Sequence, residues 1–97
     1  MSSREEALRR TEKEIVAEKA ATLGRAGERL EAALRLAAQR HYAPQDAPEG
    51  EAREGYRQAR RRALEARRIL IIQREAIGLR SHRLVDQQVP EPPRLDG

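Results

Sequence analysis

The placement of proline constrains the fold of this 97-residue chain more than any other feature. Its five prolines stand at two places, Pro44 and Pro48 in the middle and Pro90, Pro92 and Pro93 near the end. Proline disfavours a helical conformation at the residue before it but is tolerated in the first turn of a helix. The sequence therefore predicts a long helix over residues 3–43, a turn at 44–46 and a second helix over 47–77.

Local signals at the ends of these segments support the same division. Ser3 and Glu6 have the spacing of a capping box, in which each side chain binds a free backbone amide of the first helical turn. Asp46 and Glu49 repeat that spacing at the start of the second helix. Gly78 follows the second helix and accepts the left-handed conformation in which many helices end.

The chain after Gly78 is predicted to form two short pieces. Ser81 is suited to cap a third helix over residues 82–88. Residues 90–97 are too rich in proline for a helix and favour an extended tail. Residues 1–89 would then form a single helical domain that carries this tail.

The composition is typical of a protein made only of helices. Aromatic residues are 2% of the chain, charged residues are 37%, and Ala, Leu, Arg and Glu dominate. There is no cysteine, so disulfides and thiolate metal sites are excluded, and this fits a reducing cytosol. The N-terminal residues are charged and unlike a signal peptide, and no apolar run reaches the ~20 residues of a membrane span.

Apolar residues recur at helical spacing along one face of each predicted long helix. On the first helix this face holds Leu8, Ile15, Leu23, Ala26, Leu30, Ala33, Leu34, Ala37 and His41. On the second it holds Ala52, Tyr56, Ala59, Ala63, Ala66, Leu70, Gln73 and Ile77, with Leu84 beyond the glycine.

One antiparallel register brings the two faces together along their whole length. It pairs Ile15 with Ile77, Leu23 with Leu70, and Ala37 with Tyr56, and at the ends it pairs Leu8 with Leu84 and His41 with Ala52. A single register that satisfies every apolar position predicts an antiparallel helical hairpin.

Polar residues and glycines interrupt the predicted seam. Lys19 lies opposite Gln73, where Lys19 could extend to solvent beside a polar gap or the pair could fix the register. Gly24 and Gly27 lie where small residues face small residues. They indicate either a close approach of the two backbones or a kink that divides the first helix.

A second apolar face predicts that the hairpin is not alone. The seam is rich in alanine, which buries little apolar surface, so two helices would barely offset their loss of conformational entropy. Ile69, Ile72, Ala76 and Leu79 point away from the seam, and Ile71 lies on a third face among arginines. The first four residues predict an interface through which two hairpins form a four-helix bundle. The alternative is that the C-terminal segment folds back over Ile69 and Ile72.

Residues for catalysis or metal binding are sparse. The two histidines, His41 and His82, fall at opposite ends of the hairpin, and neither has the Glu-x-x-His spacing of a di-metal bundle. Ser81 and His82 are adjacent, and neighbours on a helix do not face each other. The sequence predicts no enzyme activity, no cofactor and no metal site.

A basic face on the second helix suggests a different function. It consists of Arg53, Arg57, Arg60, Arg61, Arg67, Arg68 and Arg74. Such a stripe could follow the phosphates of RNA or DNA, although no aromatic residues are interleaved for base stacking. The other interpretation is a solvated face that pairs in part with neighbouring glutamates.

Two stretches resemble a family of short bacterial helical proteins of unknown function. They are EKAATLGRAGERLEAAL, residues 18–34, and IQREAIGLRSHR, residues 72–83. The resemblance covers about a third of the chain and implies no activity. It implies that a set of residues acts together, namely Gly24, Gly27, Gln73, Arg74, Glu75, Gly78, Leu79, Arg80 and His82. Within that set a possible partner-binding cluster consists of Gln73, Arg74, Glu75, Arg80 and His82.

Together these features predict a cytoplasmic bacterial protein that acts by binding rather than catalysis. The first expectation is a self-associating interaction or scaffold module, most simply a homodimer with coiled-coil-like packing, with room for an unidentified protein partner. The alternative is a nucleic-acid-binding protein that uses the arginine face. The tail at residues 90–97 is expected either to dock in a groove or to stay solvated.

Overall fold

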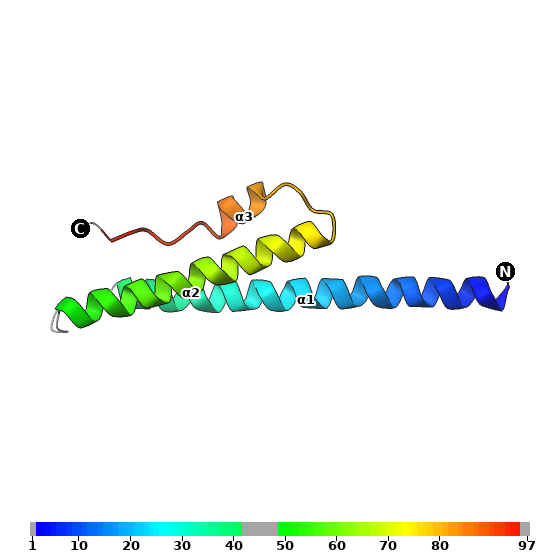
Figure 1. Ribbon diagram of the computed structural model, residues 1–97, viewed down its shortest axis with the longest axis horizontal. Coiled ribbons are helices and arrows are strands. Elements are labelled where there is room, and N and C mark those ends of the chain that lie inside the picture. The colour runs from blue at the N-terminus through cyan, green and yellow to red at the C-terminus, as the bar shows by residue number, and fades with distance from the viewer. Residues whose placement is uncertain (1, 42–48, 96–97) are drawn as a thin grey trace.

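The computed structural model describes residues 2–41 and 49–95, and in this part of the chain every regular element is a helix. The helices are α1 (Ser3–His41), α2 (Glu49–Ala76) and α3 (Arg83–Gln88). Figure 1 shows α1 and α2 lying antiparallel, with α3 and the extended tail running back along α2. The predicted all-α helical hairpin is therefore confirmed. The predicted turn at 44–46, including the predicted cap Asp46, lies outside the described residues.

The start of α1 differs from its prediction by one residue. The cap is Ser2 and not Ser3, because the Ser2 Oγ accepts a hydrogen bond from the Glu5 amide at 3.2 Å. The Ser2 carbonyl also accepts from the Glu6 amide at 3.1 Å. Ser2 and Glu5 have the same three-residue spacing as Ser3 and Glu6, so the sequence pattern fits both pairs equally well.

The end of α2 is a glycine turn of the predicted kind. Gly78 has a φ of +93°, in the left-handed region. Its amide donates to the Glu75 carbonyl at 3.0 Å, and the Leu79 amide donates to the Arg74 carbonyl at 2.9 Å. These two bonds form a Schellman motif, which satisfies the last carbonyls of the helix and reverses the chain. The predicted stop at Gly78 is confirmed, and α2 ends at Ala76, one residue before the predicted position.

We expect Gly78→Ala to lower the free energy of unfolding by about 1–2 kcal/mol, because a Cβ is strained at positive φ. Gly24→Ala is the matched control, since it adds the same methyl group inside α1 where nothing lies within 4 Å. That control should be neutral or stabilising by up to ~1 kcal/mol. Urea unfolding of both variants would measure the difference, and equal stabilities would contradict the strained turn.

The glycines of α1 have neither of their predicted roles. α1 runs unbroken from Ser3 to His41 through Gly24 and Gly27. A Cβ built on either glycine meets no atom within 4 Å, so the α2 backbone does not approach closely there. Both the kink and the close-approach interpretations are therefore wrong for this chain.

The seam is buried as predicted over the half of α1 that faces α2. Leu23, Leu30 and Leu70 pack in one apolar cluster, and Ala37 and Tyr56 belong to a second. These groupings agree with the predicted register, which pairs Leu23 with Leu70 and Ala37 with Tyr56. The core is thin, because alanine fills much of the space between the helices.

The predicted seam does not continue to the N-terminus of α1. Every residue from 2 to 21 is exposed, and we call this segment the α1 overhang. α1 has 39 residues and α2 has 28, so α1 extends well past the end of α2 (Figure 1). The predicted pairing of Leu8 with Leu84 is wrong, because the turn at Gly78 carries Leu84 back to a groove beside Leu30.

The C-terminal segment folds back, but over a different face from the one expected. Val85 is buried in the cluster that contains Leu30 and Leu70, and Ile71 and Val89 pack against that cluster. Ile69 and Ile72 stay exposed. The fold-back therefore covers Ile71, the isoleucine that the sequence placed among arginines, and leaves the second apolar face open.

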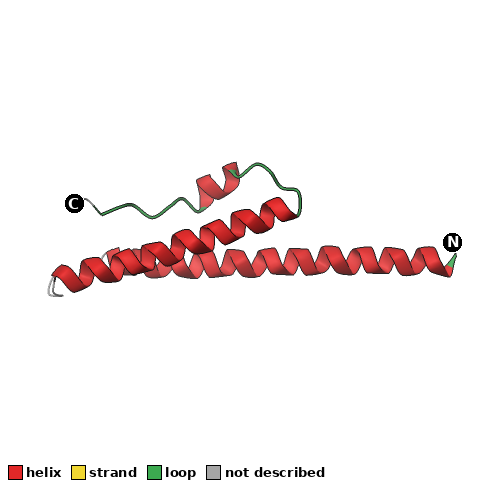
Figure 2. Cartoon of the chain, viewed as in Figure 1, coloured by secondary structure: helices red, strands yellow, loops and turns green. Residues whose placement is uncertain are grey.

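The third helix begins at Arg83, and its cap also differs from the prediction. The N-cap is His82, and no side chain caps the helix. The predicted cap Ser81 contributes only its carbonyl, which accepts a hydrogen bond from Arg74 Nη2 at 3.1 Å. Figure 2 shows α3 as a single short helical segment between two extended stretches.

Candidate interaction surfaces

Exposed large aliphatic side chains in the described part of the chain gather in the same half of the molecule. They are Leu8, Ile15, Val16, Ile69, Ile72, Ile77, Leu79 and Leu84. The first three lie on the α1 overhang, Ile69 and Ile72 lie in the last turns of α2, and the others follow α2 in the chain. We call the surface that they form the open end. The residues predicted as an oligomer interface, Ile69, Ile72, Ala76 and Leu79, are all exposed there.

The opposite half of the molecule carries a groove that holds the tail. Side chains of α2 donate hydrogen bonds to three carbonyls of residues 89–93. Arg67 Nε donates to the Val89 carbonyl at 3.2 Å, Arg60 Nε donates to the Pro92 carbonyl at 3.0 Å, and the Tyr56 hydroxyl donates to the Pro93 carbonyl. Of the two alternatives for the tail, the docked form is the one seen.

Ionic contacts add to the binding of the tail. Arg67 forms an ion pair with Asp86 and lies 3.8 Å from the Glu91 carboxylate. Its side chain is only 13% exposed, so it is screened by solvent far less than an ordinary surface arginine. Arg67 therefore holds both a backbone carbonyl and two carboxylates of the C-terminal segment.

Tyr56 stands at the centre of this groove. It is 2% exposed and packs with Ala37 and Ala59. The His41 ring meets it edge to face with 5.0 Å between ring centroids. Burial raises the pKa of the Tyr56 phenol, and nearby Arg60 opposes part of that effect. The phenol is therefore a neutral hydrogen-bond donor throughout the ordinary pH range.

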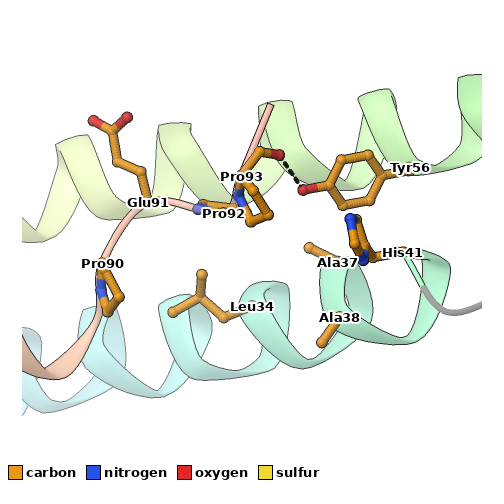
Figure 3. Close-up of a pocket in the computed structure, with 9 residues that line it drawn as sticks. All are labelled: Leu34, Ala37, Ala38, His41, Tyr56, Pro90, Glu91, Pro92 and Pro93. Atoms are coloured by element: carbon orange, nitrogen blue, oxygen red, sulfur yellow. Dashed lines mark hydrogen bonds between the residues drawn. The ribbon is translucent and has the colours of Figure 1, made fainter. Parts of the chain in front are cut away.

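A cavity of about 260 Å³ remains under the tail. Figure 3 shows Leu34, Ala37 and Ala38 of α1 below it and the proline run above it, with Tyr56 reaching across from α2. The walls are mostly apolar side chains. The tail thus lies over the groove without filling it.

The predicted nucleic-acid face is divided by these contacts. Arg60, Arg67 and Arg74 hold the C-terminal segment. Arg61 pairs with Glu54 at 3.4 Å, and Arg68 pairs with Glu65 at 2.6 Å. The remaining two members of the face, Arg53 and Arg57, are exposed and line shallow hollows near Leu95.

The Arg68 hydrogen bond and charge also affect the acidity of Glu65. The pKa of the Glu65 carboxyl is lowered, chiefly by the hydrogen bond from Arg68. Both side chains are more than half exposed, so the pair contributes little to stability.

The predicted partner-binding cluster surrounds the glycine turn. His82 Nε2 lies 3.0 Å from the Glu75 carboxylate, and Arg74 holds the Ser81 carbonyl. Gln73 Oε1 is buried without a hydrogen-bond partner, whereas Arg80 is exposed. The structure thus brings three of the five members together, with contacts that fasten the start of α3 to the end of α2.

Lys19 is exposed on the α1 overhang, which agrees with a side chain that extends to solvent.

The two histidines have different partners. His41 contacts Tyr56, whereas His82 contacts Glu75 on the other side of the chain reversal. Within residues 2–41 and 49–95, no group of three His, Asp or Glu side chains is arranged to hold a metal ion.

Comparison with known proteins identified no relative of this chain. No protein-family model, curated protein or solved structure matches this chain. The resemblance to short bacterial helical proteins therefore stays a prediction. Among the helices of the described residues, none has the length and apolar character needed to cross a membrane.

Proposed function

We propose that this protein is a non-catalytic interaction module of the bacterial cytoplasm that forms a homodimer through its open end. The observation that supports the proposal best is the gathering of eight exposed large aliphatic side chains at that end. Clusters of exposed large apolar side chains mark interaction sites in soluble proteins. In the other half of the molecule, the buried cluster of Ala37, Tyr56 and Ala59 lies between α1 and α2, with Leu95 of the tail packed against it.

The α1 overhang is a helix without tertiary support in a single chain. Isolated helices of about 15–20 residues are marginal in water, because packing of the apolar face supplies most of their stability. Residues 2–21 are all exposed, yet they carry Leu8, Ile15 and Val16 at helical spacing. A second helix packed along this row would give the overhang the support that it lacks.

The sequence of the overhang is self-complementary in one antiparallel register. With Ile15 placed against Val16 of a second copy, Leu8 faces Leu23 of that copy. The same register places Glu12 against Lys19. The two-fold axis of the dimer generates a second copy of each of these pairs. The register therefore places apolar residues against apolar residues and opposite charges against each other.

A parallel arrangement would lack this agreement. In a parallel pair with the same residues side by side, Glu12 would lie near Glu12 of the second copy, and Lys19 near Lys19. Charged pairs beside an apolar seam set the orientation of helix pairs, and like charges are unfavourable. The charge pattern therefore favours the antiparallel dimer.

The antiparallel register also brings the overhang of the second copy to the exposed end of α2. Leu23 packs in the cluster of Leu70, so Leu8 of the second copy reaches the level where Ile69 is exposed. The two overhangs and the two α2 ends would then form a four-helix arrangement. The predicted interface of Ile69, Ile72, Ala76 and Leu79 is part of the same contact.

Nucleic-acid binding through the arginine face is supported less well. Arg60, Arg67 and Arg74 are engaged with the C-terminal segment, and Arg61 and Arg68 are paired with glutamates. Arginines that are engaged within the chain are less available for the continuous track of phosphate contacts on which such binding depends.

A charge exchange tests the proposed register. We expect Glu12→Lys to raise the dimer Kd about tenfold, because it places like charges together twice in the dimer. The double variant Glu12→Lys with Lys19→Glu should restore the wild-type Kd, since it exchanges the charges across the same pair. Sedimentation equilibrium over a range of protein concentrations would measure all three constants.

Glu14→Lys is the matched control for that experiment. It makes the same change of charge at a position two residues further along, and that position lies on the opposite side of the helix. Its Kd should equal that of the wild type. A monomeric wild type at high micromolar concentration would overturn the proposal, and a double variant as weak as the single one would overturn the register.

A further inference from the structure

The groove that holds the tail has the features of a peptide-recognition site. We propose that it binds extended, proline-containing peptides from other chains that carry a carboxylate between their prolines, and that the protein's own residues 89–95 are the resident occupant. This inference is independent of the proposed dimer, because the groove lies on the covered half of the hairpin. It extends the function from self-association to the capture of a second kind of ligand.

The hydrogen bonds in the groove are donated to backbone carbonyls of the bound segment and not to a particular side chain. Arg67, Arg60 and Tyr56 donate to the carbonyls of Val89, Pro92 and Pro93. A polyproline-type segment has no internal hydrogen bonds, so its carbonyls are free to accept from outside. Its prolines are already ordered before binding, which lowers the entropy lost when it docks.

The charges in and around the groove favour an acidic ligand. Arg67 contacts the carboxylates of Asp86 and Glu91, and Arg57 and Arg61 line the hollow at the end of the tail. A carboxylate held by a poorly exposed arginine is bound more strongly than one at an open surface. A peptide with acidic residues between its prolines therefore matches the site.

The resident tail is an incomplete fit, which makes its replacement plausible on physical grounds. The cavity of about 260 Å³ between the tail and α1 is lined by Leu34, Ala38 and the prolines. Side chains that border unfilled space lose attractive contacts on that side. A peptide with a larger apolar side chain at this point would gain contacts that the tail does not make.

The test has to account for competition between the tail and an added peptide for the groove. A tethered ligand has an effective concentration of the order of millimolar, so a free peptide is at a disadvantage against the intact chain. The full-length variant Val89→Ser, Pro92→Gly, Pro93→Gly keeps every residue of the groove and weakens the tail. We call it the weak-tail variant.

The probe is a fluorescein-labelled peptide with the sequence of residues 88–95, followed by fluorescence anisotropy. We expect it to bind the weak-tail variant at least about tenfold more tightly than the wild type, because competition is reduced. Adding Tyr56→Phe to the weak-tail variant should lower the affinity about fivefold, since one hydrogen bond is lost. A peptide with Glu91→Lys should also bind more weakly.

Circular dichroism would show that the weak-tail variant keeps its helices. If it does not, NMR of the wild type supplies the same test. Addition of unlabelled peptide at millimolar concentration should then move the signals of residues 89–95 toward those of a free peptide. Equal binding to wild type and weak-tail variant, indifference to Tyr56→Phe, or NMR signals that do not move would overturn the inference. Failure of dimerisation would leave all these readouts unaffected.

Discussion

Tyr56→Ala is expected to lower the free energy of unfolding by about 3–5 kcal/mol, the range found when a large buried side chain is cut back to alanine. Among the described residues Tyr56 is the largest fully buried side chain, and it is 2% exposed. The other buried residues of its cluster are Ala37 and Ala59, which are too small to fill the space that it leaves. The change also removes the donor to the Pro93 carbonyl, so the tail loses an anchor.

Tyr56→Phe is the matched control for the buried volume. It keeps the ring and removes only the hydroxyl, so we expect a loss of about 1 kcal/mol. Urea unfolding at one fixed protein concentration is the suitable measurement, because dimerisation would make stability depend on concentration. Similar losses for the two variants, within about 1 kcal/mol of each other, would mean that the ring does not fill the core as the structure indicates.

The hairpin could be predicted because two independent patterns agreed. The prolines divide the chain into two uninterrupted segments, and one register matches their apolar faces. The register is observed where both helices are present, as Leu23 with Leu70 and Ala37 with Tyr56 show. Such agreement between local and long-range signals is what makes a fold readable from sequence.

The predicted pairing of the two helices was wrong beyond Gly78, because it continued the register past a turn at which the chain reverses. Gly78 was correctly identified as a helix stop, but a stop also redirects everything after it. Leu84 therefore lines a hollow near Leu30 while it stays exposed, and Leu8 is left exposed on the overhang. Helical periodicity carries no information about the direction of the chain after a left-handed glycine.

The candidate site was harder to predict than the fold. The spacing of the arginines showed that they share a face, but their acceptors are backbone carbonyls at Val89 and Pro92. Every residue has a backbone carbonyl, so the residue types do not show which carbonyls accept these hydrogen bonds. The available signal was Tyr56, a lone aromatic residue in an otherwise aliphatic seam, together with the proline run that could lie against it.

Ile15→Asp is expected to raise the dimer Kd by at least about 100-fold, which corresponds to about 2.7 kcal/mol. In the proposed register Ile15 lies against Val16 of the second copy, next to the two-fold axis. The substitution would therefore bring two unpaired carboxylates into the central apolar layer, and burial of an unpaired charge is costly. The α1 overhang should lose helix at the same time, because its apolar row would no longer be covered.

Ala21→Asp separates this effect from the poor helix propensity of aspartate. Ala21 lies in the same exposed segment, two residues before Leu23, and therefore on the opposite side of the helix. Ala21→Asp carries the larger propensity cost, up to about 0.7 kcal/mol, because alanine is the better helix former, but only Ile15→Asp changes the apolar row. Sedimentation equilibrium and circular dichroism should then show a helical dimer for Ala21→Asp and a monomer with reduced helix content for Ile15→Asp. Equal behaviour of the two variants would show that this row contacts no second copy, and the overhang would then have to be helical without support.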